Sequence, residues 1–158
     1  MSSPLEAPGD KSALAAVKRQ THSVQHILVV EDDTDVRQLY FDVLTRSGYQ
    51  VDTAQDGEAG WRKLHAVRQD PDSYDLLITD NNLPKLSGVE LIENVRSASM
   101  ALPVILASGA VPINAERLRC DAILPKPFTM NQLVQTVDDV LRWSTATGNG
   151  HTQATASL

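Results

Sequence analysis

One stretch of the sequence decides the fold: Leu76-Leu77-Ile78-Thr79-Asp80-Asn81-Asn82-Leu83-Pro84-Lys85-Leu86-Ser87-Gly88-Val89-Glu90-Leu91. Its first four residues favour a buried strand and lead directly into the carboxylate of Asp80. Ser87 and Glu90 match the Ser-x-x-Glu capping box, which predicts that a new helix begins there. We therefore expect Asp80 at the C-terminal end of a strand, which is the edge where open parallel α/β sheets bind ligands.

Composition limits the classes of protein to consider. The 158 residues are 42% hydrophobic, enough for one domain with a packed core. A net charge of −6 argues against nonspecific nucleic-acid binding, and no apolar run approaches the roughly 20 residues that span a bilayer. One cysteine, Cys120, excludes an internal disulfide and fits a cytoplasmic protein. We expect a flexible extension over residues 1–25, a domain over 26–143 and a disordered tail over 144–158.

Predicted strands and helices alternate along the domain. Apolar runs predict strands over residues 26–30, 49–54, 76–79, 103–107 and 122–124. Helical spacing of apolar residues predicts helices between them and after the last one, but residues 114–119 leave room for only a short helix. Gly48 is expected to end the first helix in a left-handed conformation, and Trp61 and Trp143 to pack at helix ends. This alternation predicts a doubly wound α/β domain with a five-stranded parallel sheet.

Polar side chains follow four of the predicted strands. They are Glu31, Asp32 and Asp33 after the first strand, Asp80 after the third, Ser108 after the fourth and Lys126 after the fifth. Carboxylates gathered at one edge repel one another and so require a cation. Hard oxygen ligands suit Mg²⁺, which readily shares a phosphate. A lysine charge and a serine hydroxyl beside the metal would complete an anion site.

Each of these residues also has an ordinary structural interpretation. Asp80 before Asn-Asn-x-Pro could be a turn or capping aspartate, and an acidic run after a strand often charges the start of the next helix. Lys126 alone would be a surface lysine, and Ser108 before a glycine would be a turn residue. Because these residues follow four different strands together, we favour a shared metal and anion site over the separate structural interpretations.

The sequence resembles the receiver domain of bacterial two-component response regulators over about residues 26–142. The motifs that carry the resemblance are Val29-Val30-Glu31-Asp32-Asp33, Asp80-x-x-Leu83-Pro84 with Gly88 after it, Ala107-Ser108-Gly109 and Lys126-Pro127-Phe128. The resemblance implies a flavodoxin-like (βα)5 fold with strand order 2-1-3-4-5 and a cis Lys126–Pro127 bond.

The resemblance also implies a role for each site residue. Asp80 would accept a phosphoryl group from a sensor histidine kinase or phosphotransfer protein. Asp32 and Asp80 would bind Mg²⁺ directly, Glu31 would act through water, and the Asn82 backbone carbonyl would complete the metal site. Ser108 and Lys126 would bind the phosphoryl group, and the change would reach a downstream protein through a docking surface. The regulator would act alone or as part of a longer signalling protein.

Three features depart from the family pattern. Arg119 stands just before the fifth strand, where a glycine is common. Ile123 stands where most receivers carry the Tyr or Phe that swings inward on activation, and the segment between Ser108 and Lys126 is about one helical turn short. Ile123 and the shortened segment keep open a pseudo-receiver, a docking module that works without phosphorylation. A phosphatase of the haloacid dehalogenase type is the other alternative, but Asn82 stands where that family needs a general-acid Asp.

Overall fold

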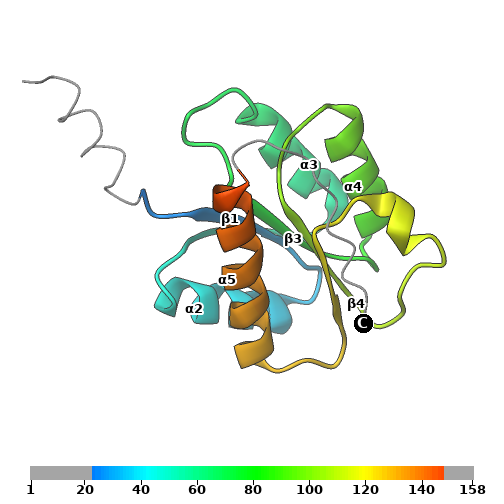
Figure 1. The fold of residues 1–158 in the computed structure, drawn as a ribbon. Coiled ribbons are helices and arrows are strands. Elements are labelled where there is room, and N and C mark those ends of the chain that lie inside the picture. Colours follow the sequence, from blue (N-terminus) through cyan, green and yellow to red (C-terminus); the bar gives the residue numbers. More distant parts are fainter. Residues whose placement is uncertain (1–22, 148–158) are drawn as a thin grey trace, which may run out of the picture.

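The structure is a computed structural model that describes residues 23–147. Its centre is a sheet of five strands: β1 (His26–Val30), β2 (Gln50–Ala54), β3 (Leu76–Asp80), β4 (Val104–Ser108) and β5 (Ala122–Pro125). All paired strands are parallel, and their order is β2-β1-β3-β4-β5, as expected (Figure 1). Nearly all of the expected N-terminal extension, and the tail beyond residue 147, lie outside the described residues.

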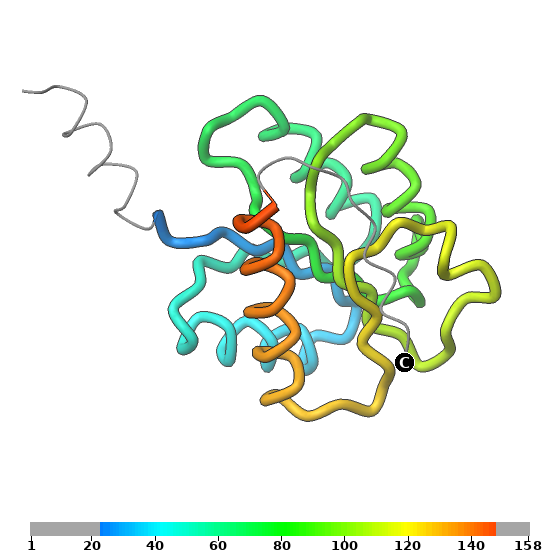
Figure 2. Tube along the Cα trace, in the orientation of Figure 1, coloured from blue at the N-terminus to red at the C-terminus, as the bar shows by residue number. Residues whose placement is uncertain are grey.

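Helices cover both faces of this sheet. They are α2 (Thr34–Arg46), α3 (Gly57–Ala66), α4 (Gly88–Ser97) and α5 (Met130–Ala146), with a short 3-10 helix, η1 (Ala115–Leu118), between β4 and β5. Helices α2 and α5 pack on one face, and α3 and α4 on the other, as the tube in Figure 2 traces. The doubly wound architecture is therefore confirmed, and the crossover expected to be short is a single 3-10 turn.

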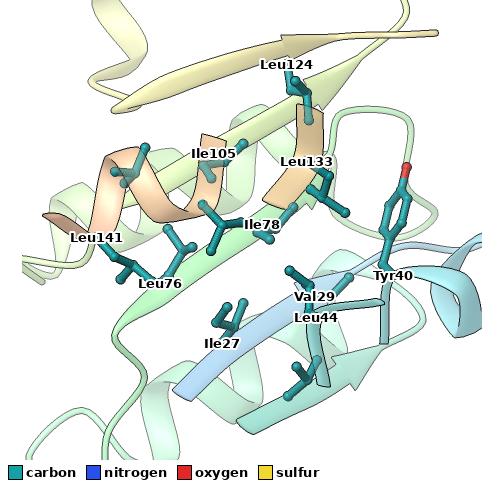
Figure 3. Packing of buried hydrophobic residues seen from close by; sticks show 13 residues of the cluster. Ile27, Val29, Tyr40, Leu44, Leu76, Ile78, Ile105, Leu124, Leu133 and Leu141 are labelled. Carbon is teal, nitrogen blue, oxygen red and sulfur yellow. The ribbon is translucent and has the colours of Figure 1, made fainter. Parts of the chain in front are cut away.

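The strand that carries Asp80 is buried along its whole length. Its side chains alternate between the two faces, so Leu76 and Ile78 join one core cluster while Leu77 joins the other. Figure 3 shows Leu76 and Ile78 facing Leu133 and Leu141 of α5. Burial on both faces explains the continuous apolar run in the sequence. It also means that Asp80, the last residue of β3, lies in a buried position.

Side-chain caps fix where the helices begin. Ser87 and Thr129 form complete capping boxes at α4 and α5. Asp33 caps α2 and Asp56 caps α3, each accepting backbone N–H bonds of the first turn. These caps set the entry point of each helix directly after the polar loops that follow the strands.

Three residues just past helix ends lie in the left-handed backbone region: Gly48 after α2, Ser99 after α4 and Arg119 after η1. Gly48 has φ +95° after α2, as expected from its position. Arg119 has φ +50° after η1, which gives a physical reason why glycine is common there in receivers. The Lys126–Pro127 peptide bond is cis, as the resemblance implied.

The C-terminal part of the domain differs from expectation in two respects. Helix α5 continues to Ala146, three residues beyond the boundary expected at residue 143, because no helix-breaking residue occurs before Gly148. Trp143 is 61% exposed rather than packed, since the buried stripe of α5 ends with Val140 and Leu141. Trp61 does pack against the core on the α3 side. Within residues 23–147, no helix has the length and apolar character needed to cross a membrane.

Candidate functional site

The parallel sheet brings the predicted polar residues to one edge. Asp80 ends β3 and Ser108 ends β4, while Glu31 and Lys126 directly follow β1 and β5. Carboxylate oxygens of Glu31, Asp32 and Asp80 all lie within 4.8 Å of one another. Two of these carboxylates, Glu31 and Asp80, belong to buried residues, whereas Asp32 is exposed. We refer to these three residues as the acidic pocket, and Asp32 is the member that is exposed to solvent.

Lys126 extends from the loop after β5 into this pocket. Its Nζ lies 3.1 Å from Oδ2 of Asp80 and 3.5 Å from Oε2 of Glu31. Partial burial disfavours the ammonium, but the hydrogen bond to Asp80 and the charges of both carboxylates outweigh it. The pKa of Lys126 is therefore raised, and the side chain stays charged. An interpretation of Lys126 as an unpaired surface lysine is wrong.

The other oxygen of Asp80 is fixed by the backbone. Oδ1 accepts a hydrogen bond of 2.7 Å from the Asn81 N–H, so both carboxylate oxygens have a donor. Gly88 lies directly behind this residue: a Cβ there would lie 2.1 Å from the Asp80 carbonyl oxygen. Helix α4 is capped by Ser87, which leaves the Asp80 side chain directed into the pocket rather than used as a cap.

Glu31 carries a buried oxygen without a hydrogen-bond partner. Its Oε1 accepts the Asp33 N–H at 3.1 Å, whereas Oε2 has no hydrogen-bond partner among residues 23–147 and lies 3.5 Å from Nζ of Lys126. Burial raises the pKa of Glu31, and the Asp33 N–H and Lys126 oppose this increase. A buried, unsatisfied carboxylate oxygen among two further carboxylates fits a hard divalent cation with bound water, and these residues therefore suit Mg²⁺.

Ser108 lies at this edge but bonds within its own turn. Its Oγ donates to the Ala110 carbonyl at 2.6 Å and accepts from the Ala110 N–H at 3.3 Å. The backbone nevertheless joins it to the lysine loop, because the Lys126 N–H donates to the Ser108 carbonyl at 2.9 Å. The serine hydroxyl is thus within the site while engaged elsewhere.

The remaining expected residues take different positions. Asn82 is exposed in the loop between β3 and α4. Ile123 is half-buried in β5 and registers with Leu106 of β4.

Sequence reasoning missed two residues that organise the pocket. Asn81 accepts the Gly88 N–H on its carbonyl at 3.0 Å and the Val89 N–H on its Oδ1 at 3.2 Å, which closes the loop between β3 and α4. Arg37 of α2 donates to the carbonyls of Glu31 and Asp32. The Asn-Asn pair gave a weak signal for the first, and nothing distinguished Arg37 from any helix arginine.

Comparison with known proteins identifies the family. The model for the response regulator receiver domain matches residues 27–138, which is most of the chain. The chain belongs to the response regulator receiver family. It is a receiver domain of two-component systems, which is a signalling domain, and the receiver family interacts with histidine kinases or phosphotransfer proteins. Receiver domains bind Mg²⁺ at an acidic site, and this receiver has such a cluster.

Curated relatives extend beyond the receiver. The chain is 30% identical over 126 residues to the transcriptional regulatory protein CpxR homolog of Haemophilus influenzae, a match covering 78% of this chain and 53% of that protein. It is 37% identical over 119 residues to the uncharacterized transcriptional regulatory protein YrkP of Bacillus subtilis, covering 73% and 49%. The chain therefore spans about half the length of these relatives.

Solved structures show the same fold. A CheY-like receiver domain protein from Methanospirillum hungatei superposes with a TM-score of 0.71 at 24% identity, covering 80% of this chain and 100% of that one. The response regulator TrrA from Thermotoga maritima, solved in complex with Mg²⁺ and BeF, gives a TM-score of 0.65 at 28% identity, covering 74% and 99%.

Proposed function

We propose that this receiver accepts a phosphoryl group on Asp80 from a partner histidine kinase or phosphotransfer protein and thereby switches a protein-docking surface. The observation that supports this most directly is the contact of 3.1 Å between Asp80 Oδ2 and Lys126 Nζ inside a three-carboxylate cluster. A structural aspartate would need neither the cluster nor a half-buried lysine. The single cysteine cannot form an internal disulfide, which fits a protein that receives its phosphoryl group in the reducing cytoplasm.

The proposed transfer uses the chain's own groups in defined roles. A carboxylate oxygen of Asp80 attacks the phosphorus of a phosphohistidine, the new O–P bond forms, and the N–P bond breaks as the imidazole leaves and takes up a proton. Lys126 stabilises negative charge on the transferred group. Mg²⁺, when bound, would neutralise negative charge on the phosphoryl oxygens. It would be held by Asp32 and Asp80, by Glu31 through water, and by the Asn82 carbonyl.

The proposed switch begins at Ser108. Its hydroxyl now donates to Ala110, so binding a phosphoryl oxygen requires that this hydrogen bond be given up. Because the Ser108 carbonyl also accepts from the Lys126 N–H, the ends of β4 and β5 move together. We expect the change to reach the surface formed by η1, β5 with Ile123, and α5, where a downstream protein docks.

Labelling with a small phosphodonor tests the acceptor. Incubation with acetyl phosphate and Mg²⁺ should add one phosphoryl group to the protein, measured by intact mass. Asp80→Asn should abolish this uptake. Asp139→Asn, an exposed carboxylate on α5, is the matched control and should be labelled like the natural protein. Continued labelling of the Asp80 variant would assign the acceptor to another residue.

The pseudo-receiver remains the second candidate, because Ile123 replaces the usual aromatic residue and η1 is a single 3-10 turn. Amide shifts with Mg²⁺ and beryllofluoride separate the two functions. A phosphorylation switch predicts changes at Ser108 and Ile123, whereas a pseudo-receiver predicts an unchanged spectrum. Turnover of ordinary phosphate esters, expected of a haloacid dehalogenase, should be poor because Asn82 cannot act as a general acid.

A further inference from the structure

Arg37 makes a contact that the proposed chemistry does not use directly. Its Nη1 donates to two consecutive backbone carbonyls, that of Glu31 at 2.8 Å and that of Asp32 at 3.2 Å. The arginine belongs to the first half of α2, and its side chain is half-buried. One guanidinium nitrogen thus ties the helix back to the two acidic residues that precede it.

The structure assigns to Arg37 the role of a positioning residue for the divalent cation site: it holds the Glu31–Asp32 turn in the conformation that binds the metal. The inference rests on the proposed function, because it concerns the same acidic pocket. It adds a residue that touches neither the metal nor the phosphoryl group and acts through the backbone of two expected ligands.

Other interactions of the turn leave this task to Arg37. The Glu31 N–H donates to the Ala54 carbonyl, and the Asp33 N–H donates to Oε1 of Glu31. Asp33 itself is occupied as the cap of α2. These bonds fix the amide nitrogens of Glu31 and Asp33. Among residues 23–147, Arg37 is the side chain that donates to the carbonyls of Glu31 and Asp32.

Carbonyl orientation matters here because it fixes where the side chains point. The direction of each carbonyl sets the backbone angle ψ, and with it the Cα–Cβ directions of the turn. Three carboxylates within 4.8 Å of one another repel, so a free turn would separate them before a cation binds. Groups that orient metal ligands typically contribute about 10-fold to 100-fold in metal affinity.

Arginine is suited to this task where lysine is not. The guanidinium presents fixed, planar N–H donors and keeps its charge throughout the physiological pH range. A lysine has the charge but a flexible, compact ammonium without the fork. Arg37→Lys should therefore recover only part of the effect, while Arg37→Met keeps the apolar stem and removes the donors altogether.

Magnesium titration followed by amide shifts tests the role. The dissociation constant of Arg37→Met should rise about 10-fold over that of the natural protein, with Arg37→Lys between them. Arg46→Gln removes an exposed arginine of the last turn of the same helix and should leave the constant unchanged. Val137→Ala lowers stability from inside the core, far from the turn in sequence, and controls for general destabilisation.

The outcomes separate this inference from the proposed function. If the Mg²⁺ dissociation constant of Arg37→Met lies within twofold of that of the natural protein, Arg37 serves only to hold the start of α2, and the inference fails. The inference also fails if Val137→Ala weakens Mg²⁺ binding as much as Arg37→Met does. If the natural protein itself gives no Mg²⁺ response, the metal site in the proposed function is overturned, and the positioning role with it.

Discussion

The Lys126 ammonium lies 3.1 Å from Oδ2 of Asp80, although β5, which Lys126 directly follows, and β3, which Asp80 ends, are not neighbours in the sheet. Strand β4 runs between them, and Lys126 crosses its end to reach the carboxylate. The contact therefore depends on all three strands ending at the same level. It also places a fixed positive charge where a phosphoryl group on Asp80 would carry its negative charge.

Removing that charge should slow phosphorylation. For Lys126→Gln, we expect the rate of labelling by acetyl phosphate to fall by about 100-fold, since one preorganised donor to developing charge is lost. Magnesium binding should persist, because no metal ligand is changed. Lys63→Gln, an exposed lysine on α3, is the matched control. Equal rates for the two variants would remove Lys126 from the transfer.

A methyl group at Gly88 should disturb the acceptor residue. Its Cβ would lie 2.1 Å from the Asp80 carbonyl oxygen, so the loop between β3 and α4 must shift. We expect Gly88→Ala to lower the free energy of unfolding by about 1–3 kcal/mol, measured in urea. Gly109→Ala meets nothing within 4 Å and should change it little. Equal stability of the two variants would contradict the close approach.

Alkaline pH should destabilise the fold through its tyrosines. Burial, and then the hydrogen bond to Asp138, raises the pKa of Tyr49 from 10.0 to about 12, and burial raises that of Tyr40 to about 12. Because the folded pKa exceeds the unfolded one, this stability is complete below pH 10 and is lost as pH rises through 12. The free energy of unfolding of Tyr49→Phe should fall less steeply with pH, measured by urea unfolding at several pH values between about 9 and 12. An unchanged profile would contradict the shift.

Truncation of the buried stripe of α5 should be costly. Leu133 is fully buried between α5 and the sheet, so Leu133→Ala should cost about 2–5 kcal/mol of unfolding free energy. Leu39→Ala removes a leucine that is 46% exposed on α2 and should cost much less. Thermal or urea unfolding followed by circular dichroism measures both. Similar losses of unfolding free energy in the two variants would contradict the full burial of Leu133 between α5 and the sheet.

The sequence predicted the parts of the molecule in which local pattern and topology act together. Apolar runs ending in polar residues located the strands, and parallel pairing then required Asp80, Ser108 and Lys126 to meet at one edge. The capping box at Ser87 fixed the start of α4 for the same local reason. The roles of these residues in phosphorylation stay predictions until they are tested.

Contacts that depend on side-chain torsions could not be predicted in this way. The Ser108 hydroxyl bonds to Ala110 within its own turn, a choice that no spacing in the sequence reveals. Arg37 looks like any helix arginine until its guanidinium is seen against two carbonyls. Trp143 was expected to pack at a helix end, but its position on the outer side of α5, beyond the buried stripe that ends with Val140 and Leu141, leaves it exposed.

The brevity of β5 bears on how a downstream protein can recognise this receiver. It is an edge strand of four residues, and its last residue, Pro125, has no N–H to offer. A partner cannot extend the sheet by laying a long strand alongside it, since too few main-chain groups are free to pair. The proposed downstream protein, if it docks at this edge, would have to recognise side-chain shape and charge, which a small shift in the underlying backbone would rearrange.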